Sequence, residues 1–89
     1  MSEIPASLIE YPSDFPIKIM GPIHDEFAQT MIEVVMRFDP DFHAGKLESR
    51  PSTKGNFLAL TVTVRATSRE QLDDLYRALT SHPMVKVVL

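Results

Sequence analysis

A chain of 89 residues has room for one hydrophobic core, so we expect a single domain. The absence of cysteine excludes disulfides, thiolate metal sites and cysteine nucleophiles. The formal net charge of −3 argues against broad binding to nucleic-acid backbones, and no apolar run has signal-peptide or membrane-helix length, so we expect a cytoplasmic protein.

Residues 1–14 are predicted to form an N-terminal arm, and residues 15–89 the domain. The arm carries three apolar side chains that can hold it on the domain: Leu8, Ile9 and Tyr11. The first strand is predicted over residues 15–21, where apolar residues alternate with exposed ones. Gly21 and Pro22 then turn the chain.

The apolar period becomes helical over residues 23–38, which predicts the first helix. Its buried stripe consists of Phe27, Met31, Val34, Val35 and Phe38. Asp39-Pro40 ends this helix, because the residue before a proline avoids the α region. After a loop over residues 41–45, a weaker strand is predicted over residues 46–52, and Pro51 assigns it to a sheet edge.

A hairpin turn at Lys54-Gly55 leads into the longest strand, which stops at Thr67. One face of this strand is uniformly apolar and is predicted to be buried: Leu58, Leu60, Val62, Val64 and Ala66. Thr67 and Glu70 have the spacing of a capping box before a second helix over residues 68–81. A last strand is predicted over residues 84–89, with Val85, Val87 and Leu89 inward.

This order of elements, β-α-β-β-α-β, predicts an α+β fold of the ferredoxin-like type. With right-handed crossovers, both helices cover one face of an antiparallel sheet with strand order 4-1-3-2. The other face of the sheet has no helix to cover it.

The sequence also resembles the YbeD-like family of small bacterial proteins. The resemblance is carried by Leu8-Ile9-Glu10-Tyr11-Pro12, Lys18-Ile19-Met20-Gly21, the hairpin Pro51-Ser52-Thr53-Lys54-Gly55-Asn56-Phe57 and the ending Val85-Lys86-Val87-Val88-Leu89. It implies a cytoplasmic protein with a ferredoxin-like fold that is often likened to ACT regulatory domains. The family is described as uncharacterised, so it supplies no catalytic residue.

The predicted topology brings several polar residues to one edge of the sheet. These residues come from the end of strand 1, the start of helix 1, the hairpin and the loop before strand 4: Gly21, His24, Ser52, Thr53, Lys54, Gly55, Asn56 and His82. The amides at the start of helix 1 and the charge of Lys54 could hold a carboxylate or phosphate. The alternative is a well-formed hairpin with ordinary surface polarity.

Neither a metal site nor an enzyme is predicted. His24 and His82 could approach each other, but no third ligand is apparent, and surface histidines are the simpler interpretation. No nucleophile elbow or phosphate-cradling loop is present. An acylphosphatase on this fold would need an arginine in the strand 1–helix 1 loop, where this chain has Pro22-Ile23-His24. We therefore expect no cofactor.

The open sheet face is expected to be mixed apolar and basic. Its predicted members are Lys18, Met20, Phe57, Ala59, Thr61, Thr63, Arg65, Met84, Lys86 and Val88. Such a face can contact a protein partner or a second copy. It can also bind RNA, although Phe57 alone is available to stack on a base in this acidic protein. The remaining alternative is that the arm covers this face with Leu8, Ile9 and Tyr11.

The sequence thus predicts a non-enzymatic regulatory or protein-interaction module, either a monomer or a weak homodimer. The alternative is an ACT-like small-metabolite sensor that holds an amino-acid carboxylate at Gly21 and the start of helix 1. The predicted ligand- or partner-binding residues are Gly21, His24, Ser52, Lys54, Gly55, Phe57 and Arg65.

Overall fold

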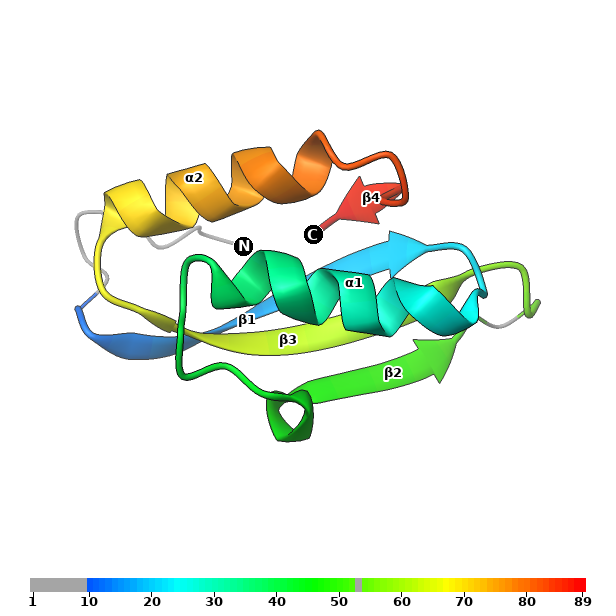
Figure 1. The fold of residues 1–89 in the computed structure, drawn as a ribbon, viewed down its shortest axis with the longest axis horizontal. Coiled ribbons are helices and arrows are strands. Elements are labelled where there is room, and N and C mark those ends of the chain that lie inside the picture. The colour runs from blue at the N-terminus through cyan, green and yellow to red at the C-terminus, as the bar shows by residue number, and fades with distance from the viewer. Residues whose placement is uncertain (1–9, 53) are drawn as a thin grey trace, which may run out of the picture.

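The computed structural model describes residues 10–52 and 54–89, and it confirms the predicted order of elements (Figure 1). The helices and strands, in chain order, are β1 (Ser13–Gly21), α1 (Asp25–Met36), a 3₁₀ turn (Ala44–Lys46), β2 (Leu47–Pro51), β3 (Leu58–Ala66), α2 (Arg69–Thr80) and β4 (Val87–Val88). No helix in this part of the chain is long and apolar enough to cross a membrane.

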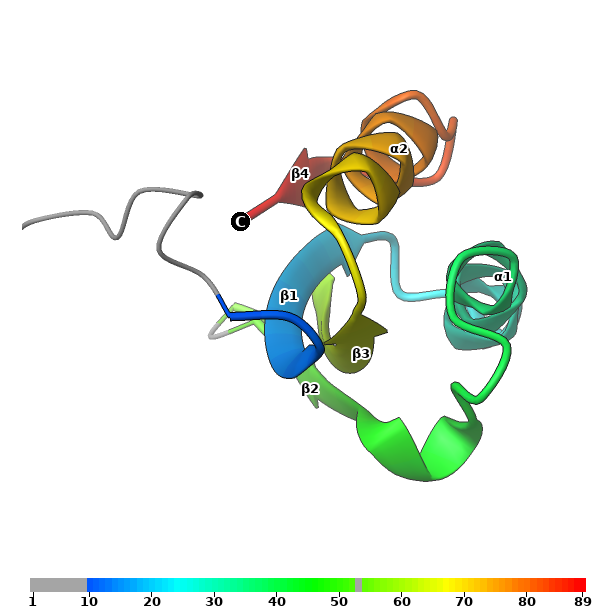
Figure 2. The same cartoon turned by 90° about the vertical axis from the view of Figure 1, so that its left-hand side faces the viewer.

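The four strands form one antiparallel sheet in the order β2-β3-β1-β4. This is the predicted order 4-1-3-2 read from the opposite edge. Both helices pack on the same face of the sheet, as the end-on view shows (Figure 2). No described helix lies on the opposite face.

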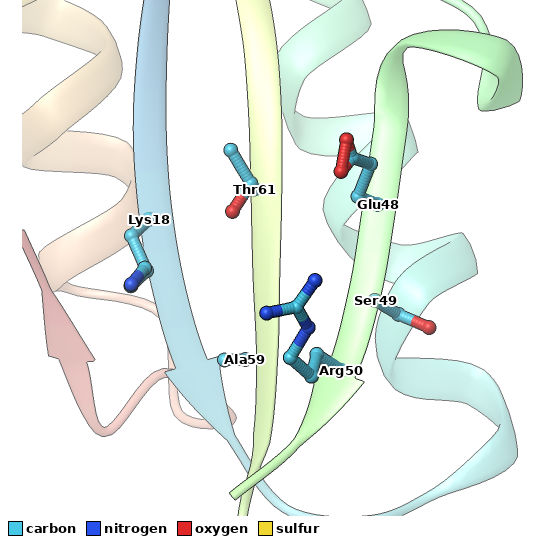
Figure 3. Close-up of a pocket in the computed structure, with 6 residues that line it drawn as sticks. All are labelled: Lys18, Glu48, Ser49, Arg50, Ala59 and Thr61. Atoms are coloured by element: carbon cyan, nitrogen blue, oxygen red, sulfur yellow. The ribbon is translucent and has the colours of Figure 1, made fainter.

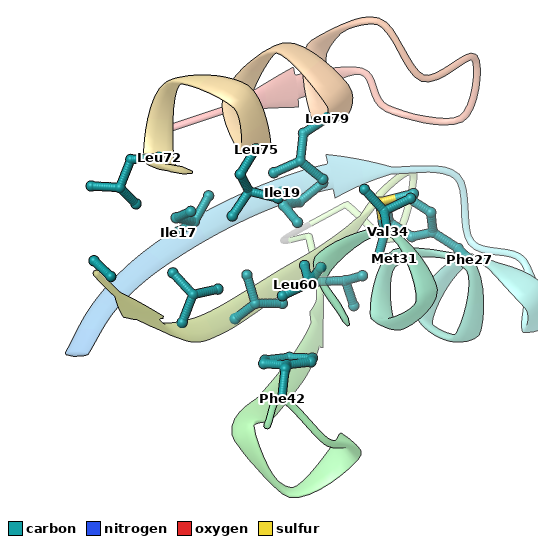
Figure 4. Close-up of a cluster of buried hydrophobic side chains, with 14 residues drawn as sticks. Ile17, Ile19, Phe27, Met31, Val34, Phe42, Leu60, Leu72, Leu75 and Leu79 are labelled. Carbon is teal, nitrogen blue, oxygen red and sulfur yellow. The ribbon is translucent and has the colours of Figure 1, made fainter. Parts of the chain in front are cut away.

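The core lies between the sheet and the two helices, where the predicted stripes meet (Figure 4). On the sheet, the registers Ile17↔Val62 and Ile19↔Leu60 place these four side chains side by side, each fully buried. The helices contribute Phe27, Met31, Val34, Val35, Leu72, Leu75 and Leu79. Each such side chain contributes roughly 1.5–3 kcal/mol in transfer free energy.

Phe42 adds to this core from a segment that was predicted to be a plain loop. Its side chain is 2% exposed, and it extends the buried cluster beneath the 3₁₀ turn (Figure 4). The segment is anchored by Asp39, whose carbonyl oxygen accepts a hydrogen bond from the Phe42 amide at 3.0 Å.

The element boundaries differ from the prediction by one or two residues at both ends of the helices and at the start of β1, whose end at Gly21 was predicted correctly. β1 begins at Ser13, because its ladder with β3 continues through Asp14↔Arg65 to Ser13↔Ala66. The predicted division between arm and domain at residues 14 and 15 therefore falls inside a strand. α1 begins only at Asp25, after the N-cap residue His24.

The predicted cap of α2 was displaced by one residue. Ser68, not Thr67, is the N-cap, and its hydroxyl accepts from the Gln71 amide at 3.0 Å. The Gln71 side chain completes the arrangement, since its Oε1 accepts from the Thr67 amide at 2.7 Å. Glu70 therefore takes no part in a capping box; it is one of the acidic residues in the first turn.

Of the three inward residues predicted for the last strand, Val85 does pack against the core, whereas Val87 and Leu89 do not. Val87 and Leu89 are 42% and 66% exposed, whereas Val88 packs against the core. The reason is the register Ile19↔Val88, because directly paired residues of an antiparallel ladder share one face. β4 itself has two residues, although the Lys86 amide and the Leu89 amide also bond to β1 carbonyls.

Candidate functional site

The hairpin residues that were predicted to bind a ligand mainly stabilise the hairpin itself. The Ser52 hydroxyl accepts from the amides of Asn56 and Phe57, at 3.2 and 3.1 Å. The Ser52 carbonyl accepts from Gly55 at 2.9 Å, and Gly55 has a φ of 71° that favours glycine. Lys54 is exposed beside it. Ser52 and Gly55 therefore fix the shape of this loop, and Lys54 is exposed to solvent on it.

Gly21 and His24 also have structural roles at the start of α1. A Cβ on Gly21 would lie 2.3 Å from Phe27 Cζ and 2.6 Å from the Met84 carbonyl oxygen, so no space for a ligand exists there. His24 Nδ1 accepts from the Glu26 amide at 3.1 Å. Asp25 and Glu26 occupy the first turn, and their charge disfavours a bound anion.

The three histidines share one local arrangement. In each, Nδ1 accepts the backbone amide two residues ahead, at 3.1 Å for His24, 3.0 Å for His43 and 3.1 Å for His82. These nitrogens thus cap turns. No group of three potential metal ligands occurs within residues 10–52 and 54–89.

The expected edge of the sheet does contain a hollow, which we name the apical hollow. Its volume is about 610 Å³. The β1–α1 turn, the hairpin and the α2–β4 loop form its walls, with Pro22, Ile23, Gly55, Asn56, Phe57, Pro83, Met84, Val85 and Lys86 as lining residues. Of the predicted site residues, only Gly55 and Phe57 line it.

Arg65 lies away from this group, at the opposite end of β3. Its guanidinium is 3.3 Å from the Asp14 carboxylate, its direct neighbour in the β1–β3 register. The hairpin residues precede the first residue of β3, whereas Arg65 is next to its last. The predicted site residues therefore divide between the two ends of the sheet.

The open sheet face carries a second hollow across three strands, which we name the sheet trough (Figure 3). Its volume is 440 Å³, and its lining residues are Lys18, Glu48, Ser49, Arg50, Ala59 and Thr61. The small side chains of Ala59 and Thr61 form the floor on β3. Lys18 from β1 and Arg50 from β2 stand on either side of it (Figure 3).

Glu48 and Arg50 were missing from the predicted open face. β2 is short and exposed, so its alternation alone does not show which side faces the helices. The registers Glu48↔Thr61 and Arg50↔Ala59 settle the matter, because Thr61 and Ala59 belong to the open face. The open-face positions of Glu48 and Arg50 could have been predicted by combining the alternation of β3 with the length of the hairpin, since together these two fix the register.

The two cations of the trough differ from three of the four arginines outside it, the exception being Arg37, which like them has no salt bridge among the described residues. Arg65, Arg69 and Arg77 each pair with an aspartate, at 3.3, 3.8 and 3.0 Å. Within the described residues, neither Lys18 nor Arg50 has a salt bridge. Their donors are therefore available to an anion placed over Thr61.

Tyr11 does not cover the open face, contrary to the arm-cover alternative. It packs against the core cluster, on the side of the sheet where the helices lie. Leu8 and Ile9, the other two residues of the predicted cover, lie outside the described residues.

Comparison with known families accounts for nearly the whole chain. Residues 6–89 match the family described as "Protein of unknown function (DUF493)". The chain belongs to this family. It is 71% identical over 83 residues to a UPF0250 protein of Ralstonia nicotianae, covering 93% of this chain and 86% of the relative. It is 65% identical over 89 residues to a UPF0250 protein of Paraburkholderia phytofirmans, covering both chains completely. These matches confirm the expected family of small uncharacterised bacterial proteins.

A solved structure shares the fold of this DUF493 protein. The solution structure of protein HP0495 from H. pylori matches with a TM-score of 0.74 at 15% identity, covering 100% of this chain and 98% of that chain. The likeness supports the α+β architecture described above.

Proposed function

We propose that this DUF493 protein is a non-enzymatic interaction module that binds a protein partner across its open sheet face. The sheet trough is the observation that carries the proposal. Lys18 and Arg50 come from different strands, stand over a floor of small side chains, and have no salt bridge among the described residues. Two neighbouring cations that form no salt bridge within the described residues can bind an acidic group of another molecule.

The distribution of charge supports an acidic partner. The helices present six carboxylates and two arginines. The open face presents three cations, Lys18, Arg50 and Arg65, against two carboxylates, Asp14 and Glu48. Although the whole protein has a net charge of −3, the open face of the sheet thus has more cations than carboxylates. A face with this charge attracts an acidic surface.

The small-metabolite sensor has less support from the geometry. Its carboxylate was expected at Gly21 and the start of α1. Phe27 and the Met84 carbonyl fill the space beside Gly21, and Asp25 and Glu26 make the first turn acidic. RNA binding rests on Phe57 alone as a stacking platform.

Site-directed photocrosslinking in bacterial cells tests the interaction module. A photoreactive phenylalanine analogue replaces Thr63 on the open face in one variant and Gln29 on the outer face of α1 in the other. We expect a discrete adduct from position 63 only, and its loss when Lys18→Glu and Arg50→Glu are added. Mass spectrometry of the adduct distinguishes a second copy from a different protein. No adduct at position 63, or equal adducts at both positions, would overturn the proposal.

A further inference from the structure

The apical hollow has an apolar floor that belongs to the body of the protein. Phe57 is half-buried, and Met84 and Val85 pack against the core cluster. Ile23 stands at the rim with 55% of its surface exposed, one of the few large apolar side chains exposed in the described part of the chain. A volume of 610 Å³ is ample for one large apolar side chain.

The charge of the hollow is positive. Lys86 Nζ lies 5.9 Å from the centre of the Phe57 ring, a cation–π distance, and no carboxylate forms a salt bridge with it in the described residues. No acidic residue of the described part of the chain lines the hollow. Lys54, exposed beside Gly55, adds a second cation near the rim. The site therefore complements an apolar group that has a carboxylate next to it.

The walls of the hollow are held in place by hydrogen bonds from backbone amides to backbone and side-chain acceptors. The Lys86 amide donates to the Met20 carbonyl at 2.7 Å. The Met84 amide donates to His82 Nδ1 at 3.1 Å, and Ser52 holds the hairpin on the other side. A site held in this way loses little conformational freedom when it binds.

The hollow adjoins the sheet trough. Phe57 precedes Ala59, on the floor of the trough, by two residues, a spacing of roughly 6–7 Å along an extended chain. We infer that the apical hollow receives an apolar side chain from a partner segment whose neighbouring residues are acidic. This inference rests on the proposed function, because the same segment would place its next carboxylate between Lys18 and Arg50.

A titration with a defined peptide tests the inference directly. The probe is acetyl-Gly-Asp-Phe-Asp-Gly-amide, added to the ¹⁵N-labelled full chain at low salt. We expect amide shifts at Gly55, Phe57, Val85 and Lys86. Replacing both aspartates of the probe by asparagine should weaken binding about fivefold, and replacing its phenylalanine by alanine should abolish the shifts.

Two matched variants of the protein complete the test. Lys86→Met removes the ammonium and keeps most of the apolar stem, and it should weaken the peptide about fivefold. Lys46→Met makes the same change in the 3₁₀ turn and should leave binding unchanged. Absence of shifts in the hollow, or equal binding of the aspartate and asparagine peptides, would overturn the inference.

The crosslinking experiment separates this inference from the proposed function. If the adduct at position 63 persists while the peptide does not bind, the hollow is not the anchor site and the interaction module stands. If the peptide binds as expected while no adduct forms, the hollow recognises the segment and the sheet face is not the interface.

Discussion

Gly21 is a residue whose missing side chain lets three elements meet. A Cβ there would lie 2.3 Å from Phe27 Cζ and 2.6 Å from the Met84 carbonyl oxygen, and the second of these atoms is backbone. Gly21→Ala is therefore expected to lower the free energy of unfolding by about 1–3 kcal/mol, measured by urea denaturation. Gly55→Asn is the control, because its surroundings are open and asparagine tolerates a positive φ. Wild-type stability of Gly21→Ala would contradict this account.

Asp39 is the one buried charged residue among those described, with 4% of its surface exposed. Its carboxylate accepts from the Arg65 amide at 2.9 Å and the Asp41 amide at 3.3 Å. Asp39→Ala removes the acceptor of the Arg65 amide and should cost about 1–3 kcal/mol in chemical denaturation. The exposed neighbour Asp41→Ala should change stability by less than about 0.5 kcal/mol. Equal effects of the two substitutions would contradict the proposed role of the carboxylate.

Tyr76 links stability to alkaline pH. Burial raises the pKa of its phenol above the ordinary value of 10.0. The unfolded chain then releases this proton at a lower pH than the folded one, so stability is complete below pH 10 and falls as the pH rises through the folded-state pKa. Tyr76→Phe should reduce this alkaline loss, measured as the free energy of unfolding from pH 8 to 11. An unchanged pH dependence would show that the phenol does not cause it.

At the scale of the element, the start of α2 depends on a cap that lies one residue beyond the predicted one. The Ser68 hydroxyl accepts from the Gln71 amide, whereas the Thr67 side chain has no such part in the cap. Ser68→Ala should therefore cost about 1 kcal/mol, and Thr67→Ala clearly less. The helical signal in circular dichroism during thermal unfolding measures both. A larger loss of stability from Thr67→Ala than from Ser68→Ala would support the sequence-based assignment of Thr67 as the N-cap.

The buried face of a strand can be predicted from the sequence when many residues share the apolar alternation. β3 alternates over nine residues, so its buried face was predicted correctly from Leu60 to Ala66. β4 has two residues, and the turn before it sets the register. Its alternation over residues 84–89 therefore gave the wrong face for Val87 and Leu89, although Val85 packs against the core as predicted. The burial of Phe42 was not predictable, because it depends on where the chain leaves α1.

The candidate site shows the same limit. Topology alone predicted that the hairpin, the β1–α1 turn and the α2–β4 loop share an edge, and the apical hollow lies between them. It could not show that Ser52 and His24 accept backbone amides within their own turns. It also could not place Lys86 over Phe57, since this contact joins two loops distant in sequence.

At the scale of the whole molecule, the two layers differ in charge. The helices carry six of the twelve acidic residues, and the sheet face carries Lys18 and Arg50 without salt bridges among the described residues. Under the proposed function, this separation of charge would orient the molecule toward an acidic partner before contact. The proposed binding charges also lie away from the core that holds the fold together.

The two faces of the sheet should therefore respond oppositely to an added negative charge. Val62 is fully buried between the sheet and the helices, so Val62→Asp should unfold the domain. Lys18→Glu and Arg50→Glu together place two carboxylates on the exposed face, and their effect on stability should stay within about 1 kcal/mol, while binding across this face is lost. Thermal melting and the dispersion of the NMR spectrum measure folding in both variants. A normal melting curve for Val62→Asp would contradict the assigned core, and unfolding of the double variant would mean that the open face contributes to the fold.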